Sequence, residues 1–117
     1  MLRGHQEVAR LVKRVVGDMP VGASVVSVAE VYQHIFPKEI SSAELLFASY
    51  ILYPVELAIA RSAGLYWQEY QKKFQTMSLA DCLIAATVRQ FHMTLLTFNT
   101  RHFPMTDITV RNPRRLV

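Results

Sequence analysis

The sequence has little that would cross-link the chain or hold it in a membrane. It contains one cysteine, Cys82, among 117 residues, which excludes a disulfide framework and a cysteine metal cage. Charged residues interrupt every apolar run before it is long enough to cross a bilayer, and no signal-peptide pattern opens the chain. We therefore expect a cytoplasmic protein without a membrane segment, in which Cys82 is a small buried residue.

The composition fits one compact domain over residues 1–117. Hydrophobic residues make up 51% of the chain, enough for a single core, and the sequence has no internal repeat, low-complexity segment or linker. The net charge of +4 suits a partner rich in phosphate or carboxylate, although many basic domains bind neither. Composition therefore says more about the fold than about the partner.

Helical and strand-like stretches alternate along the chain. The apolar spacing predicts helices at residues 6–16, 28–36, 41–50, 55–74 and 78–90, and short strands at residues 23–27, 51–53, 94–98 and 108–110. This alternation predicts an α/β fold with small, mostly parallel strands flanked by helices. Residues 111–117 are rich in arginine, and we expect a loose basic tail there.

Three polar residues are predicted to lie at one edge of the sheet. Glu30 and Asp81 each stand alone near the start of an apolar helix, and Asn99 directly follows a strand. In open α/β sheets, ligands bind where strands end and helices begin. Carboxylate and amide oxygens suit Mg²⁺ or Mn²⁺, and such an ion can activate water against a phosphodiester. The residues thus allow a metal site at this edge.

The same residues also have an ordinary structural interpretation. Ser27-x-x-Glu30 and Ser78-x-x-Asp81 both fit the capping box, in which serine and acid satisfy backbone N–H groups at a helix start. Asn99 is a common turn residue. Taken alone, the residues leave capping and metal binding open for both acids.

A resemblance to a known family adds to this interpretation. Residues 78–103, SLADCLIAATVRQFHMTLLTFNTRHF, resemble the C-terminal signature of PIN-domain ribonucleases, in the branch of VapC-like toxins from VapBC toxin–antitoxin pairs. Upstream, SVVSVAEVYQHI is similar to the strand and helix start that carry an acid in that family, and PVELAIARSAGLYWQEY is similar to its long helix. The resemblance covers nearly the whole chain in the expected order, and it implies a PIN-like fold.

The resemblance implies roles for particular residues. Glu30 and Asp81 match the second and third acidic metal-binding positions, and the turn that supplies the fourth offers Asn99 and His102, neither of which is an acid. Thr97 and His102 would support this turn. The catalytic and metal-binding set is then Glu30, Asp81 and Asn99, with Mg²⁺ or Mn²⁺. The expected contacts to RNA phosphates come from basic residues, which are Arg101, Arg111, Arg114 and Arg115.

The chain departs from the family pattern at its start. Similar PIN domains open with a central strand of the type L-D-T-N/S-x-L-I, whose Asp is the first metal ligand, whereas this sequence opens with MLRGH. The resemblance therefore implies an N-terminally shortened PIN domain that lacks this strand and its acid.

Three hypotheses for the function follow. The first is a divalent-metal-dependent ribonuclease of the VapC-like toxin type, which would form a homodimer and be blocked by a cognate antitoxin. The second is a non-catalytic PIN remnant that binds an antitoxin or nucleic acid, since only two of four acidic positions are filled. The third is an unrelated α/β domain whose acids only cap helices.

Overall fold

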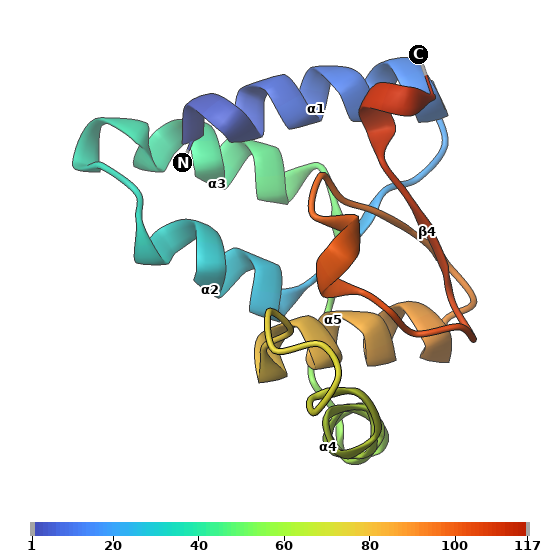
Figure 1. Ribbon diagram of the computed structural model, residues 1–117. Helices are drawn as coiled ribbons and strands as arrows, with labels where there is room; N and C mark the ends of the chain where they lie inside the picture. Colours follow the sequence, from blue (N-terminus) through green and yellow to red (C-terminus); the bar gives the residue numbers. More distant parts are fainter. Residues whose placement is uncertain (1, 117) are drawn as a thin grey trace. The chain divides into compact units, whose positions relative to one another are not determined.

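The computed structural model describes residues 2–116, and their side chains from residue 9 onward. Contacts within the chain define two compact units, which divide between Pro54 and Val55. The first unit is drawn in blue to green in Figure 1, and the second runs from green to red. Each unit has its own helices and its own pair of strands.

The first unit consists of helices around one short parallel strand pair. Strand β1 pairs with β2 in parallel, with Gly22 opposite Ile51, and helix α1 lies against α3. Buried Val31, Ala43 and Phe47 form the core, so α2 and α3 pack through their apolar faces. The elements in chain order are α1 (Leu2–Val16), β1 (Gly22–Ser24), α2 (Val25–Gln33), the 3₁₀ turn η1 (Pro37–Glu39), α3 (Ile40–Ala48) and β2 (Ile51–Tyr53).

The second unit combines two packed helices with a second parallel strand pair. Helix α4 packs extensively on α5 and is seen end-on in Figure 1, where α5 runs across the view. Strand β3 pairs with β4 in parallel, with Thr94 opposite Thr109. The elements in chain order are α4 (Leu57–Tyr70), α5 (Leu79–Gln90), β3 (Thr94–Leu96), the 3₁₀ turn η2 (Thr100–His102), β4 (Thr109–Arg111) and the 3₁₀ turn η3 (Pro113–Arg115).

Helix α5 is the centre of the second unit. Every residue from Ile84 to Val88 is buried, and Cys82 is fully inaccessible. Burying a helix on several sides requires side chains that let its neighbours approach, which the alanines Ala85 and Ala86 provide. The predicted core helix at residues 78–90 and the buried state of Cys82 are confirmed.

Strand β1 is shorter than predicted, which moves the helix start upstream. The hydroxyl oxygen of Ser24 accepts a hydrogen bond from the backbone N–H of Val26 at 3.1 Å, so Ser24 is the N-cap and α2 begins at Val25. The predicted capping box between Ser27 and Glu30 is therefore wrong, because both residues lie inside the helix. A capping hydrogen bond stabilises a helix start by about 1 kcal/mol, which outweighs the weak preference of the two valines for a strand.

Helix α4 is shorter than the predicted helix at residues 55–74. It begins at Leu57, after Pro54, and ends at Tyr70. The buried residues of α4 are Ile59, Ala63 and Tyr66, whereas Leu57 is 71% exposed and Trp67 is 42% exposed. The helix therefore packs through one narrow apolar face and leaves other large apolar side chains exposed.

The described part of the predicted loose tail is ordered. Arg111 is the last residue of β4, and the Asn112 side chain accepts a hydrogen bond from the Arg114 N–H at 3.0 Å at the start of η3. Pro113 is buried, and the Arg114 guanidinium lies 4.1 Å from the centre of the Phe98 ring. These contacts hold residues 111–116 against β3 and its following turn. Within the described residues, none of the helices combines the length and apolar character needed to cross a membrane.

Candidate functional site

The first turn of α5 holds a carboxylate in a fixed position. The Ser78 hydroxyl oxygen accepts from the Asp81 N–H at 3.1 Å, and Asp81 Oδ2 accepts from the Ser78 N–H at 2.9 Å. This reciprocal pair is the predicted capping box, which satisfies two of the backbone N–H groups that a helix start leaves without partners. These two bonds hold the Asp81 side chain in one orientation, and the residue is only 7% exposed.

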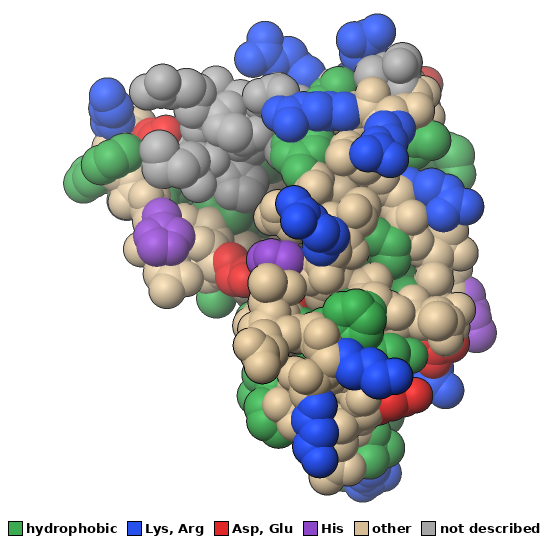
Figure 2. Space-filling model, viewed as in Figure 1, with side chains coloured by type: hydrophobic (Ala, Val, Ile, Leu, Met, Phe, Trp, Pro, Cys, Tyr) green, Lys and Arg blue, Asp and Glu red, His purple; other side chains and the backbone are tan. Residues whose placement is uncertain are grey.

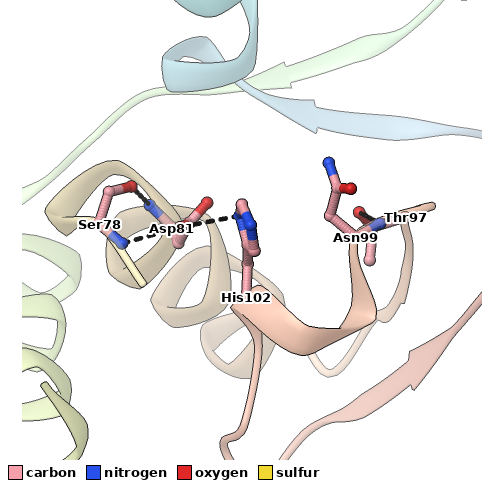
Figure 3. Close-up of polar contacts among 5 residues, drawn as sticks. All are labelled: Ser78, Asp81, Thr97, Asn99 and His102. Atoms are coloured by element: carbon pink, nitrogen blue, oxygen red, sulfur yellow. Dashed lines mark hydrogen bonds and ion pairs between the residues drawn. The ribbon is translucent and has the colours of Figure 1, made fainter. Parts of the chain in front are cut away.

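A histidine from a distant turn faces the same carboxylate. His102 Nδ1 lies 3.4 Å from Asp81 Oδ2, and Figure 3 shows the imidazole pointing toward the helix start. His102 comes from η2, which follows β3, and its side chain is 39% exposed while that of Asp81 is 10% exposed. The capping role of Asp81 therefore leaves the carboxylate accessible to a second group, so capping does not exclude a functional role.

The turn that carries His102 is fixed to the sheet. The Thr97 N–H donates to the Arg111 carbonyl at 3.1 Å, which extends the contact between the two strands beyond the paired residues. The Thr97 hydroxyl oxygen accepts from the Asn99 N–H at 3.1 Å, and the His102 N–H donates to the Asn99 carbonyl at 3.0 Å. These bonds place the Asn99 amide and the His102 imidazole on consecutive parts of one rigid turn (Figure 3).

The second unit thus brings together some of the predicted site residues. Asp81 and His102 are in direct proximity, and Asn99 belongs to the same turn as His102. Glu30 is an exposed residue of α2 in the first unit, where it takes part in an interaction of its own. Among the residues that the structure describes, no three His, Cys, Asp or Glu side chains gather closely enough to hold a metal ion.

The donor set around Asp81 is compatible with a divalent ion that keeps several waters. It offers one carboxylate, one imidazole and one amide from the same region of the unit. Asp81 Oδ1 accepts no hydrogen bond from the described residues, and Oδ2 has a lone pair left beside its bond to Ser78. A small cation that retains water needs only a few protein ligands. The Asp81 region can therefore contribute to metal binding, although it is not a complete protein cage.

Comparison with known proteins decides the family. The family model of the PIN domain matches residues 1–108. The chain belongs to the PIN domain family. The predicted resemblance and the predicted α/β fold with small parallel strands are both confirmed.

The curated relatives of this PIN domain are named as ribonucleases of the VapC type. This chain is 38% identical over 88 residues to Ribonuclease VapC10 of Mycobacterium tuberculosis, and the alignment covers 75% of this chain and 66% of the relative. It is 30% identical over 105 residues to Ribonuclease VapC19 of the same species, covering 89% of this chain and 84% of the relative. The chain thus spans just under two thirds of the length of VapC10.

Several solved structures share the fold of this chain. VapBC-1 from nontypeable Haemophilus influenzae matches with a TM-score of 0.72 at 18% identity, covering 92% of this chain and 84% of that chain. FitAcB from Neisseria gonorrhoeae matches with a TM-score of 0.60 at 29% identity, with the same two coverages of 92% and 84%. The first of these likenesses concerns the fold alone.

The predicted basic residues of this PIN domain occupy different environments. Arg101 is exposed on η2, next to His102, whereas Arg111 Nη1 donates to the Val110 carbonyl at 3.0 Å. Arg114 covers the Phe98 ring and Arg115 is exposed in η3. On the face shown in Figure 2, lysine and arginine side chains are more numerous than acidic ones. Arg101 directly precedes His102. Among the predicted RNA-binding residues it therefore lies nearest along the chain to the pair formed by Asp81 and His102.

A second polar cluster in this unit was not indicated by any local pattern of residues. The Tyr66 hydroxyl donates to Asp107 Oδ1 at 2.7 Å, and Arg89 Nε lies 3.3 Å from Asp107 Oδ2. Burial, followed by the hydrogen bond to Asp107, raises the pKa of Tyr66 well above its ordinary value. The cluster connects α4, the end of α5 and the segment before β4. Tyr66 and Asp107 are 41 residues apart, so no local spacing could have indicated the pair.

Proposed function

We propose that this PIN domain is a divalent-metal-dependent ribonuclease of the VapC toxin type that hydrolyses RNA phosphodiester bonds. The main support is the Asp81 carboxylate, which is locked by Ser78 at the start of α5 and faces the turn of Asn99 and His102. The curated relatives that share 38% and 30% of their aligned residues with the chain are both named as ribonucleases. Structure and relatives thus support the same class of chemistry.

Asp81, with the Asn99 amide oxygen, would hold Mg²⁺ or Mn²⁺ at this position. When bound, such an ion supplies positive charge against a phosphate oxygen and lowers the pKa of water. Ser78 keeps the Asp81 carboxylate oriented, and the Thr97 hydroxyl holds the backbone of the turn that carries Asn99. The helix N-terminus adds a favourable field for the phosphate group.

The substrate RNA would be bound through its backbone charges. We propose that Arg101, Arg111, Arg114 and Arg115 contact phosphates, with Arg101 closest along the chain to the site. Contacts of this kind release counterions, so binding should weaken as the salt concentration rises. The protein is proposed to act in the cytoplasm.

We also propose that the partners are a cognate antitoxin and a second copy of the chain. The structural relatives include VapBC-1 and a toxin–antitoxin complex from Klebsiella pneumoniae, which matches with a TM-score of 0.67 at 22% identity. The positive net charge of the chain, +4, favours an antitoxin segment that carries acidic residues.

The proposed role of Glu30 rests on the family resemblance. Glu30 lies on α2 and is exposed, so its substitution should not disturb the core. A contribution to metal binding predicts that Glu30→Gln lowers the cleavage rate, whereas Glu44→Gln on α3 leaves it unchanged. Equal rates in the two variants would remove Glu30 from the site.

A second candidate function is a binding protein without catalysis. It is favoured by one observation, namely that no three His, Cys, Asp or Glu side chains gather closely enough to hold a metal ion within the described residues. A folded chain that binds an antitoxin or RNA but shows no metal-dependent cleavage would support this alternative.

The experiment that separates the two functions is cleavage of end-labelled single-stranded RNA by the purified chain. Reactions contain Mg²⁺, Mn²⁺ or a chelator, and they compare the wild type with Asp81→Asn and with Asp18→Asn. Asp18 is an exposed carboxylate in a turn of the first unit, so it controls for the loss of one negative charge. The ribonuclease proposal predicts chelator-sensitive cleavage that is lost in Asp81→Asn and kept in Asp18→Asn. Cleavage that survives the chelator or the Asp81 substitution would contradict it.

A further inference from the structure

We propose that His102 supplies a nitrogen ligand to the metal held by Asp81, which makes the site prefer first-row transition ions, Mn²⁺ among them, over Mg²⁺. This inference rests on the proposed function, because it concerns the metal of the same site. It assigns His102 a direct contact with the ion rather than a supporting role in the turn.

The spacing of the two donor atoms carries the inference. Nδ1 of His102 and Oδ2 of Asp81 are 3.4 Å apart, whereas a charge-assisted hydrogen bond between such groups is about 2.7–2.9 Å long. Two donor atoms about 2.1 Å from one ion lie about 3.0 Å apart at a right angle and about 3.4 Å apart at a tetrahedral angle. The observed separation is longer than a charge-assisted hydrogen bond and is close to the spacing of two neighbouring ligands of one ion.

The Asp81 carboxylate and the backbone of His102 are held in place before any ion binds. Asp81 is fixed by its bond to the Ser78 N–H, and the backbone of His102 is fixed by the N–H bond to Asn99. Phe103, the next residue, is buried, which anchors that end of the turn in the core. Sites with ligands on rigid elements lose little entropy when the metal binds.

The site is also open on one side. The His102 side chain is 39% exposed, so an ion and its water can reach Nδ1 from solvent. Asn99 on the same turn is exposed as well and can bind the ion or one of its waters. With two or three protein ligands, water would complete the coordination shell.

The donor chemistry decides between the candidate ions. Mg²⁺ prefers oxygen donors and keeps its water firmly, so an imidazole adds little to its binding. First-row transition ions accept imidazole nitrogen readily, with affinities that rise from Mn²⁺ toward Cu²⁺. Replacing an acidic ligand by histidine would therefore weaken Mg²⁺ binding and retain binding of transition ions.

The test is a binding measurement that does not depend on RNA cleavage. Mn²⁺ is bound to the full chain and pulsed electron paramagnetic resonance is used to detect coupling to a directly bound ¹⁴N nucleus. Competition with Mg²⁺ gives the relative affinities. The variants are His102→Gln, His102→Asp and the control His92→Asn, which replaces another exposed histidine at a positive φ of 52° that asparagine tolerates.

The inference predicts nitrogen coupling in the wild type and in His92→Asn, and its loss in His102→Gln. Mn²⁺ binding should weaken about tenfold in His102→Gln, while Mg²⁺ binding changes much less. In His102→Asp, the preference should shift toward Mg²⁺. A wild-type chain with bound Mn²⁺ but no nitrogen coupling would overturn the inference, as would equal Mn²⁺ affinity in His102→Gln.

The outcome is separable from that of the proposed function. Nitrogen coupling without RNA cleavage would contradict the ribonuclease proposal and leave the ligand assignment intact. Cleavage that depends on Asp81 but proceeds with no nitrogen coupling would support the ribonuclease proposal and overturn the ligand assignment.

Discussion

Replacing Asp81 with asparagine separates the capping role of this residue from its proposed chemical role. The asparagine side chain keeps an oxygen that can accept from the Ser78 N–H, as Asp81 Oδ2 does at 2.9 Å. The capping box is then largely retained, and the lost negative charge at the helix N-terminus costs about 0.3–1 kcal/mol. Metal-dependent cleavage should nevertheless disappear, because an amide is a weak and uncharged metal ligand.

Ser78→Ala is the matched variant with the opposite effect. It removes the hydroxyl that accepts from the Asp81 N–H at 3.1 Å but leaves the carboxylate in the site. Loss of such a cap lowers the free energy of unfolding by about 1 kcal/mol. For a domain of this size, that shift lowers the melting temperature by about 4 °C.

The assay pairs thermal unfolding with RNA cleavage at a temperature where every variant is fully folded. We expect a stable, inactive Asp81→Asn and a less stable, active Ser78→Ala. If Ser78→Ala were as inactive as Asp81→Asn while folded, Asp81 would matter only through the helix start. Wild-type cleavage by Asp81→Asn would refute the assignment of the site.

Three further measurements test other parts of the structure. Tyr66 has a raised pKa, so it stays protonated in the folded chain at a pH where the unfolded chain has lost that proton. Its contribution to stability is complete below the ordinary pKa of 10.0 and is lost as the pH rises toward the folded value. We expect stability to fall above about pH 10, and this fall to be smaller in Tyr66→Phe, as measured by urea unfolding; an equal fall in both would contradict it. Cys82 is fully buried, and burial raises its pKa to about 11, so a thiol reagent should modify it only on unfolding. Rapid labelling of the folded chain would show that α5 opens readily. Arg101→Ala should weaken RNA binding and reduce the slope of the logarithm of the binding constant against the logarithm of the salt concentration by about one, whereas Arg61→Ala on α4 should change neither. Equal effects of the two substitutions would indicate nonspecific attraction.

Local signals in the sequence predicted the central part of the second unit. Helix α5 was predictable because Ser78 and Asp81 form a capping box directly before a continuous apolar run. The short strands were predictable from β-branched and apolar residues next to turn formers. The proximity of Asp81 to the turn after β3 was predictable because strand ends and helix starts share one edge of an α/β sheet, and the family resemblance pointed to the same place.

Errors arose where distant contacts or competing caps decide the structure. Ser24 and Ser27 both precede apolar helical residues, and only the observed hydrogen bond of Ser24 to Val26 shows which one caps α2. The tail was predicted to be loose because its arginines are hydrophilic, yet the Arg114 side chain packs on Phe98. A contact between residues so far apart in sequence leaves no periodic signal.

The candidate site shows why the two interpretations of Asp81 did not exclude each other. Capping uses one lone pair of Oδ2 and leaves Oδ1 without a hydrogen bond from the described residues. A carboxylate has about four lone-pair sites, so it can cap a helix and bind an ion together. Sequence spacing identifies the cap, whereas the remaining accessibility of the carboxylate is a property of the folded turn.

The most direct test of the central claim is the cleavage rate of labelled single-stranded RNA during a titration with Mg²⁺ and with Mn²⁺, measured for the wild type and for folded Asp81→Asn. The account predicts a rate that rises with the concentration of the ion in the wild type and remains at background in the variant. A wild-type rate that does not depend on the ion, or an equal rise in Asp81→Asn, would contradict it.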